Sequence, residues 1–419
     1  MKFNELGIRD EIVRALADEE IIEATSIQEK AIPFILKGED VVGMSKTGSG
    51  KTAAFGIPIL ENIDPNAGLQ VLILTPTREL AVQISGELTK FGKHINCPVA
   101  TVFGGVAIEP QMRQIKKSKI VVGTPGRILD HLQRRTLDLS KITCFALDEA
   151  DKMVEMGFIE DITRILSHTP DGRQILLFGA TLSREIDDLR ARHMRDPKLA
   201  KTELNVEEDL LAQYYYDIQP NEKFSLLVHL LEKEKTNRVM IFCSTRTTVE
   251  ILARNLRTQK ISCEMIHGKL SQNRRLKVIK EFNEGGPAVL IASAVAARGL
   301  DIQNVSHVFN YDLSRDPQEY IHRVGRTARA GESGKAFTLL SGKDHDCFGQ
   351  VLQRYPIKVE KLAIPEFKKL RFNARDPQER DRQGRGQKRS FGNQGYRSSG
   401  FGERRQKHSS PGGRKWGER

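Results

Sequence analysis

The chain has 419 residues, of which 39% are hydrophobic and 29% are charged, and its formal net charge is +12 at pH 7. This length allows two domains and an appendage, at about 150 residues per domain. No apolar run approaches the roughly 18 residues of a membrane span, and no leader-like segment is present, which argues against a membrane-spanning or exported protein. Five scattered cysteines without a C-x-x-C pair argue against a zinc site or disulfide framework.

The first predicted element is a phosphate-binding loop at residues 45–52, Ser-Lys-Thr-Gly-Ser-Gly-Lys-Thr. The apolar run Val41–Met44 precedes it and an apolar-periodic stretch follows, so the loop joins a strand to a helix N-terminus. Small residues let backbone N–H groups converge on phosphate oxygens, while Lys51 neutralises charge and Thr52 offers a hydroxyl to Mg²⁺. We expect nucleotide phosphates to contact Thr47, Gly48, Ser49, Gly50, Lys51 and Thr52.

Short apolar runs then alternate with longer helical patterns. The runs are residues 70–75, 99–103, 119–123, 142–147 and 174–178. This alternation predicts an α/β domain with mostly parallel strands and helices on both faces of the sheet. Ligands of such a sheet lie at the carboxyl ends of its strands, where the phosphate-binding loop is also expected.

The run at residues 142–147 ends on the tetrapeptide Asp-Glu-Ala-Asp at residues 148–151. By itself, an acidic tetrapeptide is more often a helix N-terminus with favourable charge. Downstream of a phosphate-binding loop, however, Asp148 can hold Mg²⁺ and Glu149 can orient and deprotonate the attacking water.

Residues 201–211 are polar and acidic at first, and we expect a linker here before Tyr214 opens a new strand. Strand-like runs restart at residues 238–243, 262–266, 288–292, 305–310 and 335–340. They predict a second α/β domain of similar design. Because it has no phosphate-binding loop of its own, we expect it to complete the first site.

The composition after Pro365 shifts to Arg, Gly, Ser and Gln with isolated aromatic residues, and residues 366–419 carry 16 Lys or Arg and 6 Asp or Glu. Too little apolar area is present to offset the entropy of ordering, so we expect a disordered tail. Guanidinium and aromatic planes suit RNA bases, although a solvated tail without a ligand is the alternative. The predicted parts are residues 1–205, 206–365 and 366–419.

With these motifs the chain resembles the DEAD-box family of ATP-dependent RNA helicases, and the resemblance extends from Phe3 to Arg329. Further segments in family order are residues 24–28, 76–81, 104–105, 124–127, 179–181, 241–245, 272–275, 293–301 and 322–329. The resemblance implies two tandem RecA-like domains. It also implies a cytoplasmic, RNA-stimulated ATPase that binds RNA with little sequence preference and unwinds or remodels short duplexes.

The resemblance also implies roles for individual residues. Arg326 and Arg329 would reach the ATP phosphates as arginine fingers once the two domains close. The remaining nucleotide contacts would be Phe3, Ile21, Gln28, Gly299 and Asp301. RNA phosphates and 2′-hydroxyls would contact Thr77, Arg78, Gly105, Thr124 and Arg127 of the first domain and Arg275 and Ser293 of the second.

Four positions depart from the family pattern. Ile21 stands where an aromatic residue stacks on adenine, Gly179 replaces Ser, Ala294 replaces Asp, and Ala328 replaces Gly. Two alternatives to the helicase stay open. One is a nucleotide-gated RNA clamp or annealing protein with weak hydrolysis, which Gly179 and Ala294 favour. The other is a DNA-acting translocase.

Overall fold

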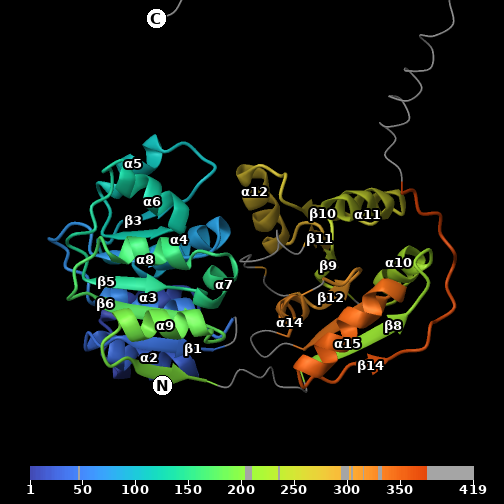
Figure 1. Ribbon diagram of the computed structural model, residues 1–419, viewed down its shortest axis with the longest axis horizontal. Helices are drawn as coiled ribbons and strands as arrows, with labels where there is room; N and C mark the ends of the chain where they lie inside the picture. The colour runs from blue at the N-terminus through green and yellow to red at the C-terminus, as the bar shows by residue number, and fades with distance from the viewer. Residues whose placement is uncertain are drawn as a thin grey trace, which may run out of the picture. The chain divides into compact units, whose positions relative to one another are not determined.

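The computed structural model describes residues 1–45, 48–202, 210–234, 236–293, 302, 305–314, 316–328 and 333–374. These residues form two seven-stranded sheets, and every strand pair in both sheets is parallel (Figure 1). Helices cover the sheets, as the alternating sequence pattern predicted. The fold of two tandem parallel α/β domains is thereby confirmed.

The first sheet has the strand order β3-β4-β2-β5-β6-β1-β7. Its strands are β1 (Val41–Met44), β2 (Val71–Leu74), β3 (Val99–Val102), β4 (Ile120–Gly123), β5 (Cys144–Leu147), β6 (Gln174–Gly179) and β7 (Lys198–Lys201). Its helices are η1 (Phe3–Leu6), α1 (Asp10–Asp18), α2 (Ser26–Leu36), α3 (Lys51–Glu61), α4 (Arg78–Phe91), α5 (Glu109–Ile115), α6 (Pro125–Gln133), α7 (Ala150–Glu155), α8 (Ile159–Leu166) and α9 (Arg184–His193).

Both faces of this sheet are buried over its central strands, which explains why most of its strands are continuous apolar runs. Successive side chains point to opposite faces of a strand. Along β5, Cys144 and Ala146 join the core layer formed with helices α1 to α4, while Phe145 and Leu147 join the layer that includes α6, α8 and α9. The site residues at the ends of the strands therefore rest on a sheet that is packed from both sides.

The second sheet has the order β10-β11-β9-β12-β13-β8-β14. Its strands are β8 (Leu211–Asp217), β9 (Val239–Cys243), β10 (Cys263–Ile266), β11 (Val289–Ser293), β12 (His307–Asn310), β13 (Gly334–Leu340) and β14 (Glu360–Lys361). Its helices are α10 (Lys223–Lys233), α11 (Arg246–Thr258), α12 (Gln272–Asn283), α14 (Pro317–Val324), η2 (Gly342–Asp344) and α15 (His345–Arg354). Helices α10 and α11 pack on one face, and α12, α14 and α15 pack on the other.

Residues 362–373, called the strap below, correct the predicted start of the tail at residue 366. The Phe372 ring lies 5.2 Å from the Phe224 ring of α10, centroid to centroid, and the Leu370 N–H donates to Ser225 Oγ at 2.9 Å. Asn373 exchanges hydrogen bonds with Asn255 of α11. The compact unit therefore ends at Asn373. Composition alone places residues 366–373 in the tail, because the partners on which they pack lie far away in the sequence.

Two other expectations about the chain's organisation remain predictions. The boundary after residue 205 and the expected disorder of residues 375–419 both fall outside the described residues.

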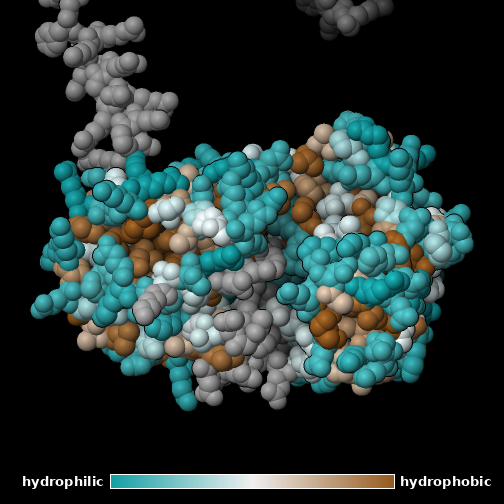
Figure 2. Space-filling model, turned by 180° about the vertical axis from the view of Figure 1, so that it is seen from behind, coloured by the Kyte–Doolittle hydropathy of each residue, from teal (hydrophilic) through white to brown (hydrophobic). Residues whose placement is uncertain are grey.

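On the face of the molecule drawn in Figure 2, hydrophilic side chains cover most of the surface of the described residues, with smaller apolar patches between them. In the part of the chain that the structure describes, no helix has the length and apolarity needed to cross a membrane.

Candidate nucleotide and RNA site

The phosphate-binding loop connects β1 to α3, as predicted. Gly48 and Gly50 have φ angles of 85° and 87°, a left-handed conformation that glycine adopts without steric cost. Lys51 begins α3 and donates from Nζ to the Ser45 carbonyl oxygen at 2.7 Å. Burial lowers the pKa of Lys51, while the carboxylates of the Asp-Glu-Ala-Asp segment act in the opposite direction. Thr47 lies outside the described residues.

Gln28 holds the phosphate-binding loop from α2. Its Oε1 accepts from the Thr25 N–H at 2.9 Å, and its Nε2 donates to the Gly50 carbonyl oxygen at 3.1 Å. A Cβ atom at Gly50 would lie 2.4 Å from this nitrogen, so only glycine leaves room for the contact. The segment expected to contact adenine is thus joined directly to the loop expected to contact phosphate.

The two other residues expected near adenine are located differently. Phe3 is 1% exposed and belongs to the core layer of the first domain, so its ring is not on an open surface. Ile21 is half-buried and packs against the same layer. Local sequence offers no means of separating a ring that contacts a ligand from one that supports the surrounding fold.

Asp148 and Glu149 lie side by side at the carboxyl end of β5, 3% and 7% exposed. Burial and the neighbouring Glu149 charge raise the pKa of Asp148 to about 7. Burial also tends to raise the pKa of Glu149, but Lys152 outweighs it, with smaller contributions from Arg326 and Lys51, so this pKa lies below its usual value. Two adjacent carboxylates thus occupy different electrostatic environments.

Lys152, in the first turn of α7, contacts Glu149, and the sequence alone did not predict this contact. Its Nζ lies 2.5 Å from Glu149 Oε1, and both side chains are at most 10% exposed. Glu149 itself has left-handed backbone angles, φ 53° and ψ 48°, where the chain turns from β5 into α7. The signal was available, because Lys152 directly follows the acidic tetrapeptide and stands three residues after Glu149.

The residues expected to contact RNA in the first domain gather at the carboxyl edge of the same sheet. Thr77 caps the N-terminus of α4, accepting from the Leu80 N–H, and Thr124 stands at the N-terminus of α6. The Arg78 side chain lies directly against Gly105, where an added Cβ would be only 2.1 Å from its Nη1. The left-handed φ of 83° at Gly105 also favours glycine.

The Arg127 side chain on α6 uses only some of its guanidinium hydrogen-bond donors. Its Nη2 donates to the Val106 carbonyl oxygen at 3.1 Å, and its Nε lies 3.6 Å from Asp130. Its Nη1 is buried and has no hydrogen-bond partner among the described residues. A guanidinium with an unused donor in the first turn of a helix is suited to a phosphate group.

The second-domain residues are only partly described. Ser293 ends β11 beside the end of β9. Arg275, expected to contact RNA, instead forms an ion pair with Glu79 of α4, Nη2 to Oε1 3.0 Å, and Gln272 donates to the same oxygen at 3.0 Å. The other expected second-domain positions, Gly299, Asp301, Arg329 and the departure at Ala294, lie outside the described residues.

His322 lies in the last turn of the second-domain helix α14, and Arg326 lies just after that helix. Arg326 is 5% exposed and is one of the groups that lower the pKa of Glu149. Burial lowers the pKa of His322 to about 4, and the charge of Lys152 adds to this effect. The described part of the predicted arginine-finger segment is therefore electrostatically linked to the acidic tetrapeptide.

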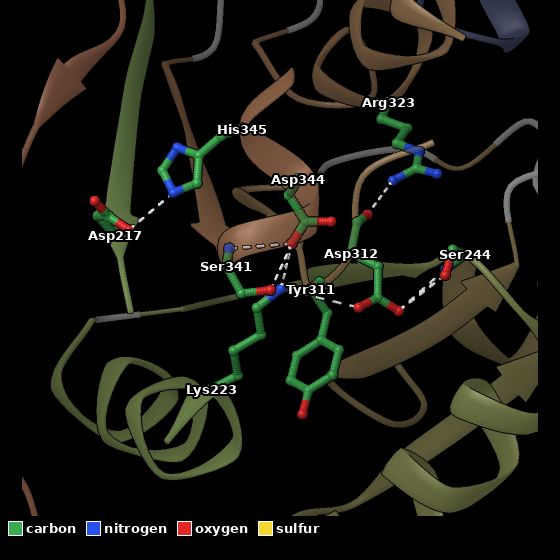
Figure 3. Close-up of polar contacts among 9 residues, drawn as sticks. All are labelled: Asp217, Lys223, Ser244, Tyr311, Asp312, Arg323, Ser341, Asp344 and His345. Carbon is green, nitrogen blue, oxygen red and sulfur yellow. Dashed lines mark hydrogen bonds and ion pairs between the residues drawn. The ribbon is translucent and has the colours of Figure 1, made fainter. Parts of the chain in front are cut away.

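A buried polar network links several elements of the second domain (Figure 3). Lys223 of α10 donates to Asp344 Oδ2 at 2.7 Å and to the Tyr311 carbonyl oxygen at 3.0 Å. Asp312 accepts from the Ser244 hydroxyl at 3.1 Å, and its carbonyl oxygen accepts from Arg323 at 2.6 Å. Arg323, 2% exposed, is thus a structural arginine of the motif, distinct from Arg326.

Comparisons with known proteins agree with this geometry. Residues 25–189 match the model of the DEAD/DEAH box helicase family, and residues 222–331 match the helicase conserved C-terminal domain. The chain is 43% identical over 368 residues to the DEAD-box ATP-dependent RNA helicase CshA of Geobacillus kaustophilus, covering 87% of this chain and 78% of that protein. It is 45% identical to the ATP-dependent RNA helicase CshA of Listeria monocytogenes, covering 87% and 71%.

Solved structures give the same relationship. A DEAD box protein of Methanococcus jannaschii is 41% identical, with a TM-score of 0.55 and coverage of 87% of this chain and 99% of that one. Saccharomyces cerevisiae Dbp5, bound to RNA and ADP BeF3, is 30% identical, with a TM-score of 0.78 and coverage of 86% and 95%. These likenesses extend over both sheets, so the chain belongs to the DEAD-box family of ATP-dependent RNA helicases.

Proposed function

We propose that this helicase hydrolyses ATP with Glu149 as the general base and with the loop at residues 48–52 holding the phosphates. The observation that carries this proposal is the buried carboxylate pair at the end of β5, whose charges act on the phosphate-loop residue Lys51. A general base needs a carboxylate that is charged at neutral pH. The low pKa of Glu149, set against the raised pKa of Asp148, supports giving this role to Glu149.

We further propose that Asp148 and Thr52 would hold Mg²⁺. Oxygen ligands suit this ion, and the pKa of Asp148, raised to about 7 by burial and by Glu149, indicates a carboxylate that needs a nearby cation to stay charged at neutral pH. When bound, Mg²⁺ supplies positive charge to the phosphate oxygens. Asp148 then contributes a fixed charge, because its Oδ1 is held by the Glu149 N–H at 2.9 Å.

The second domain would complete the site. We propose Arg326 and Arg329 as arginine fingers and Gly299 and Asp301 as ribose contacts, each acting after the domains close. The likeness to Dbp5 bound to RNA and ADP BeF3 supports this arrangement. Since an arginine supplied across a cleft stabilises the transition state only when the cleft is shut, RNA that favours closure would stimulate hydrolysis.

RNA would bind with little sequence preference along Thr77, Arg78, Gly105, Thr124 and Arg127, and along Arg275 and Ser293 of the second domain. Backbone amides, hydroxyls and guanidinium groups recognise phosphates and 2′-hydroxyls, which are the same in every sequence. Mss116, a solved relative with 26% identity and a TM-score of 0.74, is bound to ssRNA. On this proposal Arg275 must leave Glu79 before it can contact RNA.

We also propose the cytoplasm as the compartment of this RNA-binding chain. All five cysteines are free, which agrees with a reducing environment.

A second function, an RNA clamp or annealing protein, is favoured by one observation. Because position 179 is glycine, the chain lacks the hydroxyl that family members carry beside the final Asp of the acidic tetrapeptide. In this chain that Asp accepts hydrogen bonds from the backbone N–H groups of the two residues after Gly179. Such a chain would bind RNA in an ATP-dependent manner but would separate few duplexes per ATP consumed.

One experiment tests these functions together. ATP turnover is measured with single-stranded RNA, with DNA of the same sequence and without nucleic acid, beside displacement of a short RNA duplex. We expect stimulation by RNA alone and ATP-dependent displacement. RNA stimulation without displacement would favour the clamp, and equal stimulation by DNA would contradict the assigned substrate.

A further inference from the structure

Helix α5 and the turn that follows it carry three basic side chains on their outer face. Arg113, Lys116 and Lys117 are exposed, and their i, i+3, i+4 spacing places them on one side of a helix. Gln111 and Ile115 are buried on the opposite side. We propose that the three basic residues, called the α5 basic face below, bind phosphates of an RNA strand that continues past the first-domain contact residues. This inference rests on the RNA path proposed above.

The charges of the α5 basic face are not compensated by neighbouring acids. On α12, by comparison, the exposed Lys277 pairs with Glu281 one turn further on. Among the described residues, none of the three side chains of the α5 basic face forms a hydrogen bond or an ion pair. This holds even for Arg113, although Glu109 stands four residues before it on the same helix. Three uncompensated cations on one face create a positive potential that attracts an anion.

The neighbouring Lys119 differs from these residues because it has a structural role. It is 8% exposed, and its Nζ donates to the carbonyl oxygens of Pro65 and Ala67 at 2.8 and 2.7 Å. Lys119 thereby fixes the loop between α3 and β2. The side chains of the α5 basic face make no such contact with the described residues, so a structural role does not explain their charge.

The strand order places α5 at the end of the proposed RNA path. Strands β2, β4 and β3 are successive neighbours in the first sheet, and β3 is the edge strand. Thr77 follows β2, Thr124 follows β4 and Gly105 follows β3, so the proposed RNA contacts form a line toward this edge. Figure 1 shows α5 beside β3 at the end of the sheet. A strand that continues past Gly105 therefore meets α5 next.

Side-chain hydrogen bonds fix α5 to the loop that contains Gly105. Gln111 Nε2 donates to the carbonyl oxygens of Phe103 and Ala107 at 3.1 and 3.3 Å. Arg127, a proposed RNA contact, donates to the Val106 carbonyl oxygen in the same loop. The α5 basic face is thus held in a set position relative to the RNA contacts. A surface that is positioned before binding loses less conformational entropy when the ligand arrives.

The other end of the contact line lies toward the second domain. Arg275, a proposed second-domain RNA contact, pairs with Glu79, which directly follows Thr77 and Arg78. The line therefore has one free end on the first domain, at β3. An RNA that is lengthened at the end lying on β3 gains the α5 basic face, whereas lengthening at the other end does not.

The test compares RNA affinities of the full wild-type chain and of the combined variant Arg113→Gln, Lys116→Gln and Lys117→Gln. Fluorescence anisotropy is measured with ADP and beryllium fluoride present. One probe is the shortest oligouridine that fully stimulates ATP turnover, and two others are the same RNA extended at the 5′ or at the 3′ end. Thermal unfolding verifies the fold of the variant.

The variant should lose affinity for one of the two extended RNAs only. At about 50 mM salt we expect a loss of about tenfold for that RNA and of about twofold or less for the short RNA. Three lost phosphate contacts, at about 0.7 each, should make the slope of log K against log salt less steep by about 2 for that RNA. The charge-conserving variant Arg113→Lys, Lys116→Arg and Lys117→Arg should retain the wild-type affinities.

The matched control removes three cations from another part of the first domain. It combines Arg164→Gln, Arg190→Gln and Arg192→Gln on α8 and α9, helices that follow β5 and β6 and not the edge strand β3. Its affinities should change by about twofold or less, because salt screens exposed charges that are distant from the RNA.

The inference is overturned if the variant of the α5 basic face loses affinity equally for the short and both extended RNAs, or for none of them. An equal loss in the control variant, or an effect that requires a base-paired extension, also overturns it. Failure of the proposed RNA path gives a different result, because Arg127→Ala would then leave the affinity for the short RNA unchanged.

Discussion

The Asp151 carboxylate accepts a hydrogen bond from the backbone N–H of Thr181 at 3.2 Å. The same oxygen accepts from the Ala180 N–H at 3.1 Å, so the last acid of the Asp-Glu-Ala-Asp segment fixes the loop that follows β6. An added Cβ at Gly179 would lie 3.3 Å from Asp151 Oδ1. A serine at this position would need only a small shift of that carboxylate, and its hydroxyl could donate to it.

Gly179→Ser should therefore increase the number of duplexes separated per ATP consumed. The added hydrogen bond would tie the nucleotide side of the sheet more tightly to the loop after β6. Gly179→Ala is the matched control, because it adds the Cβ without the hydroxyl. Strand displacement and ATP turnover are measured on the same samples. The same ratio in the Ser and Ala variants would show that the hydroxyl has no part in coupling.

Arg326→Ala should lower RNA-stimulated turnover by about 10³-fold, the usual scale for loss of an arginine finger. Affinity for ATP in the absence of RNA should change little, because the finger is expected to act after closure. Arg190→Ala, which breaks an exposed pair with Asp187 on α9, serves as the control. A loss of tenfold or less at saturating ATP and RNA would argue against a site shared by the two domains.

Lys223→Met should destabilise the second domain by about 3–5 kcal/mol, because it leaves the buried Asp344 carboxylate without its cation. The measurement is urea unfolding. Lys369→Met is the matched control, since Lys369 is 80% exposed and pairs with Glu222 at the start of α10. Its effect should stay within about 0.5 kcal/mol. Equal losses of unfolding free energy in the two variants would contradict a stabilising role for the buried network in Figure 3.

Two truncations test the strap. A chain ending at Ala374 should unfold at the same temperature as the full chain. A chain ending at Pro365 loses the contacts of Phe367, Leu370 and Phe372 with the second domain and should lose about 3 kcal/mol of stability. Thermal and urea unfolding of the two chains give the comparison, and indistinguishable stabilities would show that the strap contributes little.

The chain ending at Ala374 also tests the basic tail. If about five tail residues contact phosphates, the tail adds about −3.5 to the slope of log K against log salt. The part of the RNA affinity that the tail supplies then falls roughly 100-fold between about 50 and 200 mM salt. Turnover at saturating RNA should stay nearly the same. Equal affinity and equal slope with and without the tail would identify it as a solvated appendage.

Much of the fold could be predicted because both faces of each sheet are buried. Runs such as residues 70–75 and 238–243 are apolar throughout most of their length and overlap β2 and β9. The edge strands β7 and β14 escaped prediction because Lys198–Lys201 and Glu360–Lys361 alternate or expose polar residues and are short. Their assignment depends on a neighbouring strand that local sequence does not reveal.

The site divides in a similar way. Parallel strands bring their carboxyl ends to one edge, so spacing alone could place Lys51, Asp148 and Thr124 together. Spacing alone could not predict which side chains are buried or which side chains form ion pairs. The core position of Phe3 and the pairing of Arg275 with Glu79 both depend on packing between distant segments.

ATP turnover by E149Q, measured with saturating RNA beside the wild-type chain, tests the proposed chemistry most directly. The substituted amide would keep the shape of the side chain but could not accept a proton from water. We predict that turnover is abolished while ATP still binds and RNA is held in an ATP-dependent manner. Turnover by E149Q at the wild-type rate would contradict the account.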